Sequence, residues 1–319
     1  MAPILLPDVL IGHAAYPDGP TGCTVILCPD GAVAGYDVRG SASGTRQTDS
    51  LSALHRVPYV HGILLAGGSS FGLDAGGGVL QYLEERGVGF DVTVTRVPIV
   101  PTAILFDLGF GDPGVRPDKA LGYQACLNAL SEEPAQGSVG AGTGATIGKL
   151  FSVLQATKGG LGYSAVRTDE GLVVAALVVV NAFGDVLDLA GNIMAGARSG
   201  PDDRTFADTW ACMKQGLQPR QFLVQNTTLG VILTNARLDK AEARKLAQLA
   251  QNGLVRVIAP VHTLYDGDIV FSLSVGDLDA PLMQVGLLAQ EMIQEAVLRA
   301  VRTADGLGRL PAWRDLQKP

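Results

Sequence analysis

The stretch "LVQNTTLGVILTNARL", residues 223–238, sets three polar side chains against a run with the character of a buried strand. Asn226, Thr227 and Thr228 interrupt what otherwise reads as two short apolar strands. Three interpretations compete for them. They could form a polar turn, an N-x-[ST] glycosylation acceptor, or a peptide bond that the chain cuts in itself to expose a threonine.

The chain around this stretch is apolar and has no obvious linker. Of its 319 residues, 47% are hydrophobic and 17% are charged, which is ample for a large buried core. Length alone permits one large or two ordinary domains. Strand-like and helix-like segments mix throughout, so we expect one layered α/β domain spanning residues 1–319.

Charge excludes two classes of partner. The chain has 24 basic and 31 acidic residues, a net charge of −7, and no basic run. Binding to nucleic acid or to an anionic membrane therefore has no electrostatic support. The N-terminal apolar run lacks a basic region and is broken by Pro7, and no later stretch resembles a membrane span. We expect a cytoplasmic protein, which disfavours the glycosylation interpretation.

The cysteines indicate neither disulfides nor a metal site. The four cysteines contain no CxxC pair, and no histidines stand at metal-ligand spacing. We expect reduced core thiols, no metal and no cofactor.

Several segments are apolar or β-branched throughout, which is typical of strands covered on both faces. These predicted strands are 23–28, 103–108, 171–180, 228–233, 254–259 and 269–275. Helical patterns lie between them, at 72–87, 116–133, 238–253 and 282–301. In the third, Asp239 and Glu242 predict a capping box at the start, and Gly253 predicts the end.

Glycines gather in "LAGGSSFGLDAGGG" (65–78), "GSVGAGTGATIGK" (137–149) and "TKGGLG" (157–162), which suggests closely packed backbone or a pocket. The second cluster resembles a phosphate-binding loop. It fails that pattern because Thr143 replaces the first glycine and Leu150 replaces the magnesium-binding Ser or Thr. Nucleotide binding is thus the weakest of the functions we weigh.

Four further polar residues have both a structural and a functional interpretation. Lys149 either reaches solvent or is held in a polar pocket. Asp266 and Asp268 flank a glycine and form either a β-turn or a carboxylate pair facing a site. Asn181 either begins a turn after a strand or delivers its amide to a pocket. The histidines accompany no nucleophile motif such as G-x-S-x-G.

A threonine needs no histidine if it is the first residue of a chain, because its own α-amine then serves as the base. This requires cleavage of the preceding bond. Attack of the Thr227 hydroxyl on the Asn226 carbonyl, followed by hydrolysis, would separate residues 1–226 from residues 227–319. The residues alone leave this interpretation open beside the polar turn.

Four motifs together carry a resemblance to a known family. "NTTLGVILTNARL", "YDGDIVFSLS", "GAGTGATIGK" and "LAGGSSFGLDAGGG" resemble the self-processing L-aminopeptidase/D-esterase (DmpA-like) peptidases. The Asn-Thr-Thr site is most similar to that of nylon-oligomer (6-aminohexanoate oligomer) endo-hydrolases. The resemblance runs over nearly the whole chain, and the motifs occur in the family's order.

The resemblance implies a four-layer αββα sandwich like that of N-terminal-nucleophile hydrolases, with different connectivity. It also implies a precursor that cuts itself into an α fragment, 1–226, and a β fragment, 227–319. These fragments stay together and assemble into homo-tetramers or larger rings. Substrates would be short peptides, amino-acid amides or esters, or ω-amino-acid oligomers.

Site residues carry over position by position. Thr227 matches the nucleophile, and Asn181 matches the asparagine that helps to hold the oxyanion. Lys149 matches a lysine beside the nucleophile. Asp266 and Asp268 match an aspartate pair that orients this lysine and the nucleophile.

One position departs from the pattern. Phe106 stands where the resemblance places an active-site tyrosine, and a phenyl ring cannot donate a hydrogen bond. We expect a self-processing amide hydrolase. The alternative is a glycine-rich binding or structural protein of the same fold that never cuts itself.

Overall fold

The computed structural model describes residues 6–219 and 226–317, and its central feature is one strand shared by two sheets. Strand β2 (Thr21–Val38) is 18 residues long. Its first part pairs with β1 (Leu10–Tyr16) and β4 (Val60–Ala66), and its last part pairs with β16 (Ile269–Leu278). The long strand therefore joins the two sheets along their common edge.

Both sheets are mixed, with one parallel pair among antiparallel pairs. The first sheet continues from β4 to β7 (Thr102–Ile104) and β3 (Gly44–Arg46), with β4 and β7 parallel. The second has the order β10-β11-β14-β16-β2. Its other strands are β10 (Gly160–Arg167), β11 (Val173–Asn181) and β14 (Thr227–Ala236). Strands β10, β11 and β14 are antiparallel, whereas β14 and β16 are parallel.

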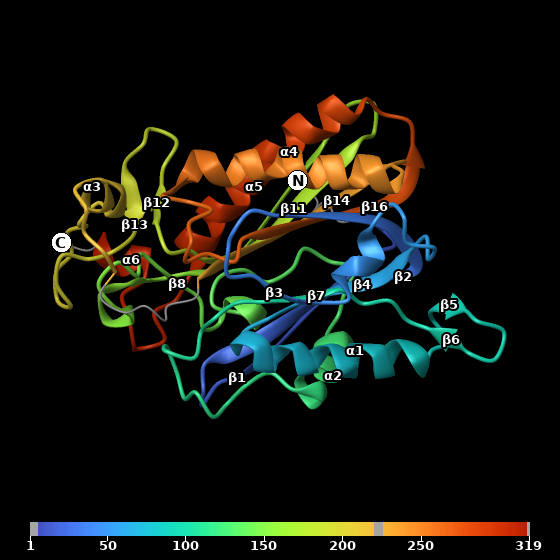
Figure 1. Cartoon of the computed structure of the whole chain (residues 1–319), viewed down its shortest axis with the longest axis horizontal. Helices are drawn as coiled ribbons and strands as arrows, with labels where there is room; N and C mark the ends of the chain where they lie inside the picture. Colours follow the sequence, from blue (N-terminus) through green and yellow to red (C-terminus); the bar gives the residue numbers. More distant parts are fainter. Residues whose placement is uncertain (1–5, 220–225, 318–319) are drawn as a thin grey trace.

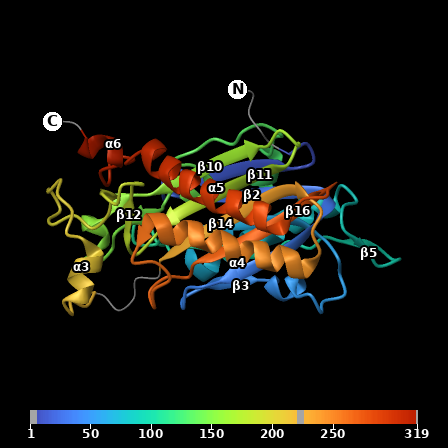
Figure 2. The same cartoon turned by 90° about the horizontal axis from the view of Figure 1, so that it is seen from above.

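Helices cover the outer face of each sheet, as Figure 1 shows. Helices α4 (Lys240–Val257) and α5 (Leu282–Thr303) lie over the second sheet, and Figure 2 shows them crossing its strands. Helices α1 (Ala75–Glu84) and α2 (Lys119–Leu127) lie under the first sheet. The result is the predicted αββα layering.

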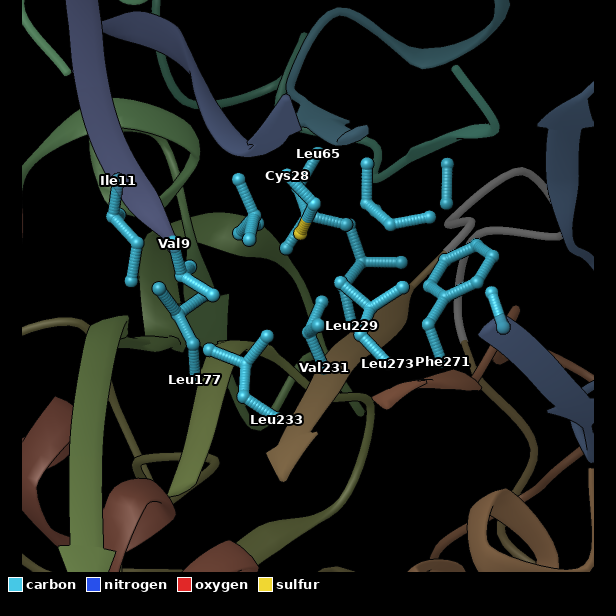
Figure 3. Packing of buried hydrophobic residues seen from close by; sticks show 14 of the residues in the cluster. Val9, Ile11, Cys28, Leu65, Leu177, Leu229, Val231, Leu233, Phe271 and Leu273 are labelled. Carbon is cyan, nitrogen blue, oxygen red and sulfur yellow. The ribbon is translucent and has the colours of Figure 1, made fainter. Parts of the chain in front are cut away.

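The hydrophobic core has three layers that match this arrangement. Between the sheets pack side chains from both, including Leu65, Leu177 and Leu233 (Figure 3). Strand β14 shows the period of two that a covered strand requires. Leu229, Val231 and Leu233 belong to this inner layer, whereas Ile232 faces α4 and α5. A third layer lies between the first sheet and α1 and α2.

Shorter elements complete the described chain. They are η1 (Thr48–Leu51), η2 (Ser69–Asp74), β5 (Phe90–Asp91), β6 (Arg96–Val97), η3 (Gly140–Gly142), β8 (Thr146–Ile147), η4 (Val153–Gln155), β9 (Thr157–Lys158), β12 (Asp185–Leu187), β13 (Ile193–Ala195), α3 (Thr209–Lys214), β15 (Ile258–Ala259) and α6 (Trp313–Leu316). None of the helices in the two described ranges is long and apolar enough to cross a membrane.

Several predicted elements are wrong in their extent, among them the helix 116–133, which is confined to α2. The predicted strand 254–259 is mostly helix, because α4 continues to Val257 and only Ile258–Ala259 form a strand. Gly253 does not end the helix. A Cβ at this position would lie 2.6 Å from the carbonyl oxygen of Gln290, so the glycine permits close packing of α4 on α5. The predicted strand 103–108 shrinks to β7, and residues 223–225 lie outside the described residues.

Close packing of α5 on the second sheet gives a stability prediction. A Cβ at Gly162 in β10 would overlap the carbonyl oxygen of Ala296 and lie 2.6 Å from the amide nitrogen of Ala300. Because backbone atoms cannot move aside, Gly162→Ala should lower the free energy of unfolding by about 3 kcal/mol. Urea unfolding would measure it. Gly109→Ala is the control, since the Cβ there meets only the Val153 side chain at 3.3 Å. Equal stability of the two variants would contradict the packing described.

Candidate active site

Three strand ends meet at one edge of the second sheet. Strand β11 ends at Asn181, and the antiparallel register places Asn181 opposite Thr227, the first residue of β14. Strand β16 runs parallel to β14, and an isolated bridge pairs Asn226 with Asp266 just before both strands begin. The topology therefore gathers residues that are far apart in sequence.

Thr227 is buried, with 2% of its surface exposed. Its hydroxyl Oγ1 donates a hydrogen bond to the Asn226 carbonyl oxygen at 2.5 Å. The amide of Gly267 donates to the same oxygen at 2.6 Å. A Cβ at Gly267 would lie 2.8 Å from Thr227 Oγ1, so the absence of a side chain leaves room for this hydroxyl. The carbonyl before Thr227 is thus polarised by two donors.

Asn181 and Lys149 form one hydrogen-bonded unit. Lys149 Nζ donates to Asn181 Oδ1 at 3.0 Å and to the Asn181 carbonyl at 3.2 Å. It also donates to the Thr146 carbonyl at 2.5 Å, and the Thr146 amide donates to Asn181 Oδ1 at 3.0 Å. Asn181 Nδ2 donates to the Phe106 carbonyl at 3.1 Å. Hydrogen bonds thereby fix both the oxygen and the nitrogen of the Asn181 side-chain amide.

Lys149 is held in a polar pocket and does not reach solvent, since only 2% of its surface is exposed. Burial lowers its pKa from 10.5 to about 7, with Asp266 opposing this effect and Lys158 adding to it. At neutral pH the side chain therefore exists in both protonation states. It can hold a proton or release one without leaving its place.

Asp266 is anchored by groups that follow β11 and precede β16. Its Oδ1 accepts a hydrogen bond from the Phe183 amide at 3.1 Å, and its Oδ2 accepts from the Thr263 hydroxyl at 2.6 Å. Burial, and then the neighbouring charge of Asp268, raise the pKa of Asp266 to about 7.

Asp268 ties the start of β14 to a loop. Its Oδ1 accepts from the Thr228 amide at 2.7 Å. Its Oδ2 accepts from the His262 amide at 3.1 Å and contacts His262 Nδ1 at 2.9 Å. His262 adopts φ +56, a left-handed conformation that non-glycine residues seldom take, so this contact fixes a strained loop.

The structure brings Thr227, Asn181, Lys149, Asp266 and Asp268 into one buried region. Within residues 6–219 and 226–317, no hydrogen bond or ion pair joins either aspartate to Lys149. The charge of Asp266 raises the pKa of Lys149, and Asp268 accepts a hydrogen bond from the Thr228 amide in β14. Of these two side chains, Asp268 is therefore bonded to β14, and Asp266 influences Lys149 without a direct bond.

Sequence reasoning missed three contributors. Thr146 stands in "GATIGK" and Gly267 in "YDGD". In both motifs the charged neighbours are the residues that suggest chemistry. His262 is one of the histidines for which the sequence shows no serine or cysteine nucleophile motif. Its short spacing to Asp268, across a turn, was the signal available for it.

The described residues contain no group of three or more His, Cys, Asp or Glu placed to hold a metal ion. The cysteines are free thiols; Cys23, Cys28 and Cys126 are buried, and Cys212 is partly buried.

The chain belongs to peptidase family S58, whose model matches residues 6–309. It is 38% identical to an uncharacterised aminopeptidase of Mycobacterium leprae, over 92% of this chain and 85% of that protein. It is 34% identical to a 6-aminohexanoate-oligomer endohydrolase of a Kocuria species, over 93% of this chain and 84% of that protein.

Solved structures share the fold. A Burkholderia β-aminopeptidase superposes with a TM-score of 0.69 at 21% identity, covering 98% of this chain and 90% of that one. The L-aminopeptidase D-Ala-esterase/amidase of Ochrobactrum anthropi, described as a variant of the Ntn-hydrolase fold, superposes with a TM-score of 0.69 at 20% identity. That match covers 93% of this chain and 85% of that chain. The predicted sandwich resembling N-terminal-nucleophile hydrolases is confirmed, as is the predicted family.

Burial of Lys149 gives a pH prediction. Because its pKa is about 7 in the folded chain and 10.5 as its ordinary value, the unfolded chain binds more protons between these pH values. Its contribution to stability is therefore full above pH 10.5 and is lost as the pH falls through 7. Lys149→Met should flatten the rise of unfolding free energy across this window by about 1.4 kcal/mol per pH unit.

Urea unfolding at several pH values would measure the slope, in a Thr227→Ala background that keeps the chain whole. Lys245→Met, which changes an exposed lysine, is the control and should leave the slope unchanged. A Lys149→Met slope equal to that of its parent would show that Lys149 titrates normally.

Proposed function

We propose that this member of peptidase family S58 is an amide hydrolase that matures by cutting its own Asn226–Thr227 bond and then uses Thr227 as an N-terminal nucleophile. The observation that carries the proposal is the pair of donors on the Asn226 carbonyl, Gly267 N–H and Thr227 Oγ1. A carbonyl polarised in this way, beside a buried hydroxyl, is prepared for acyl transfer.

Self-cleavage would proceed in two steps. The Thr227 oxygen attacks the Asn226 carbonyl carbon, the C–N bond breaks, and the proton leaving the hydroxyl passes to the departing nitrogen. The resulting ester joins Asn226 to the Thr227 side chain. Water then hydrolyses this ester, which leaves a carboxylate on Asn226 and a free α-amine on Thr227. During attack, the Gly267 amide stabilises the charge that develops on the Asn226 oxygen.

In the matured protein the same hydroxyl would attack a substrate amide. The freed α-amine accepts the hydroxyl proton and returns it to the leaving amine. Asn181 contributes its Nδ2 group to the oxyanion, since Nδ2 carries a second N–H beyond the one that Phe106 accepts. Lys149 holds Asn181 Oδ1 and supplies positive charge to the site. Asp268 fixes the backbone next to Thr227.

The relatives indicate the broad class of substrate. Proteins similar to this chain are named as aminopeptidases and as 6-aminohexanoate-oligomer endohydrolases. We therefore propose short peptides with a free N-terminus, amino-acid amides or esters, and ω-amino-acid oligomers as substrates. We further propose that the fragments stay together in a cytoplasmic homo-tetramer or larger ring.

Removal of the nucleophile should abolish self-cleavage. Wild-type protein should separate into fragments 1–226 and 227–319 on a denaturing gel, and intact mass should place the cut before Thr227. Thr227→Ala should stay whole, because no hydroxyl is present to attack the carbonyl.

Thr228→Ala is the matched control, since it deletes a neighbouring buried hydroxyl and keeps the Thr228 amide bound to Asp268. It should still be cut. A wild-type chain that stays intact after prolonged incubation would refute the proposal and favour a binding protein of the same fold.

Two substrate series would then distinguish the proposed classes. A panel of chromogenic amino-acid amides tests trimming from the N-terminus, and a linear 6-aminohexanoate oligomer tests internal cleavage. The Asn-Thr-Thr site favours activity on the oligomer. Thr227→Ala serves as the blank for both series, and hydrolysis of amino-acid amides alone would place the enzyme with the aminopeptidases.

A further inference from the structure

Lys158, in the glycine-rich motif "TKGGLG", is a second lysine without solvent contact. It belongs to β9, and 0% of its surface is exposed. Its Nζ donates to three backbone carbonyls, those of Gly142 at 3.0 Å, Ala145 at 2.9 Å and Gly159 at 2.7 Å. Within the described ranges no carboxylate forms an ion pair with it.

A buried cation held only by carbonyls is costly compared with an apolar side chain of similar volume. Packing alone therefore does not account for a lysine here. The Phe110 ring, with its centroid 5.4 Å from Nζ, supplies an aromatic face but no charge. The partners that distinguish Lys158 are the carbonyls of the 142–145 loop.

This loop leads directly into the candidate active site. Ala145, whose carbonyl Lys158 holds, is followed by Thr146. The Thr146 amide donates to Asn181 Oδ1, and its carbonyl accepts from Lys149 Nζ. The Ala145 carbonyl also accepts from the Gly159 amide at 2.9 Å, so Lys158 and the residue after it both hold this carbonyl. A shift of the loop would displace Asn181 and Lys149 together.

We propose that Lys158 is a positioning residue of this site, whose ammonium group fixes the 142–146 loop and brings a second positive charge to the carbonyl next to the one that Lys149 holds. The proposal rests on the function proposed above for its catalytic consequence, but not for its structural and electrostatic content. It adds the motif 157–162 to the site, as a segment that supports the groups around Thr227.

The charges around Lys158 define what it does electrostatically. Burial lowers its pKa to about 7, and Asp107 and Asp305 oppose this effect. Asp107 is itself buried, and burial raises its pKa to about 6. The charge of Lys158 also lowers the pKa of Lys149, while the charge of Asp266 raises it. Removing the Lys158 charge should therefore make Lys149 easier to protonate.

The test measures Lys149 directly. Protein labelled with ¹³C at the lysine Cε atoms is titrated by NMR in the Thr227→Ala background, and Lys149→Met identifies the Lys149 signal. Lys158→Gln keeps an N–H donor for the carbonyls and removes the charge. It should raise the pKa of Lys149, because a nearby like charge disfavours the protonated form. Lys158→Arg keeps the charge and should leave the Lys149 pKa low.

Lys240→Gln is the matched control. Lys240 Nζ also donates only to backbone carbonyls, of Ser50, Ser52, His55 and Val57, and it contacts no group of the site. It should not move the Lys149 signal. A folded Lys158→Gln protein with an unchanged Lys149 pKa would overturn the proposal. So would failure of Lys158→Gln to fold, because the lysine would then be a requirement of the fold and not of the site.

A parallel measurement in the cleavable chain keeps the two proposals apart. In the chain that retains Thr227, Lys158→Gln should shift the pH profile of self-cleavage to higher pH, in step with the Lys149 pKa. If wild type is not cut at any pH, the proposed function fails, whereas the NMR titration still decides the role of Lys158. Cleavage with an unshifted pH profile would count against Lys158.

Discussion

The register of β14 against its two neighbours is the constraint on which the candidate site depends. Antiparallel pairing puts the end of β11 beside the start of β14, and parallel pairing puts the start of β16 beside the same point. Because strand residues alternate between faces, a shift of one residue would turn Thr227 toward the opposite layer. The apolar residues that follow, Leu229 and Val231, hold this register by their burial between the sheets. The core packing and the site geometry therefore require the same strand register.

Burial then gives the polar groups at this edge their unusual properties. Lys149 and Asp266 both have a pKa of about 7, although the ordinary values of lysine and aspartate lie on opposite sides of neutrality. In each case loss of hydration is the main cause. A solvent-exposed lysine or aspartate in the same arrangement would be locked in its charged form.

The sequence predicted the parts of the fold that follow from local patterns. The long apolar runs of β11, β14 and β16 and the capping box of α4 were recognisable because burial and capping leave a periodic or positional signal. The end of α4 was not, since Gly253 reads as a helix terminator unless its neighbour α5 is known. Strand β10 was missed because its glycines, required by contact with α5, disguise it as a loop.

The site residues came mainly from family resemblance, because strand pairing between distant segments leaves no local trace in a single sequence. Thr146 and His262 show the limit: each acts by holding another residue, and only the fold reveals which one. Thr146 lies in a glycine-rich motif and His262 lies close to Asp268 in sequence, but neither position shows which group the residue holds.

Phe106 shows how a departure from a family pattern can be reconsidered once contacts are known. From sequence, a phenylalanine in place of tyrosine removes a hydroxyl donor. In the structure, however, the backbone carbonyl of Phe106 accepts a hydrogen bond from Asn181 Nδ2. This contact is available to any residue at the position, so the substitution leaves the orientation of Asn181 intact. Under the proposed function, what the phenyl ring lacks is the hydroxyl donor that a tyrosine would offer. The consequence should therefore fall on substrate preference and rate, while the architecture that aligns Thr227, Asn181 and Lys149 persists.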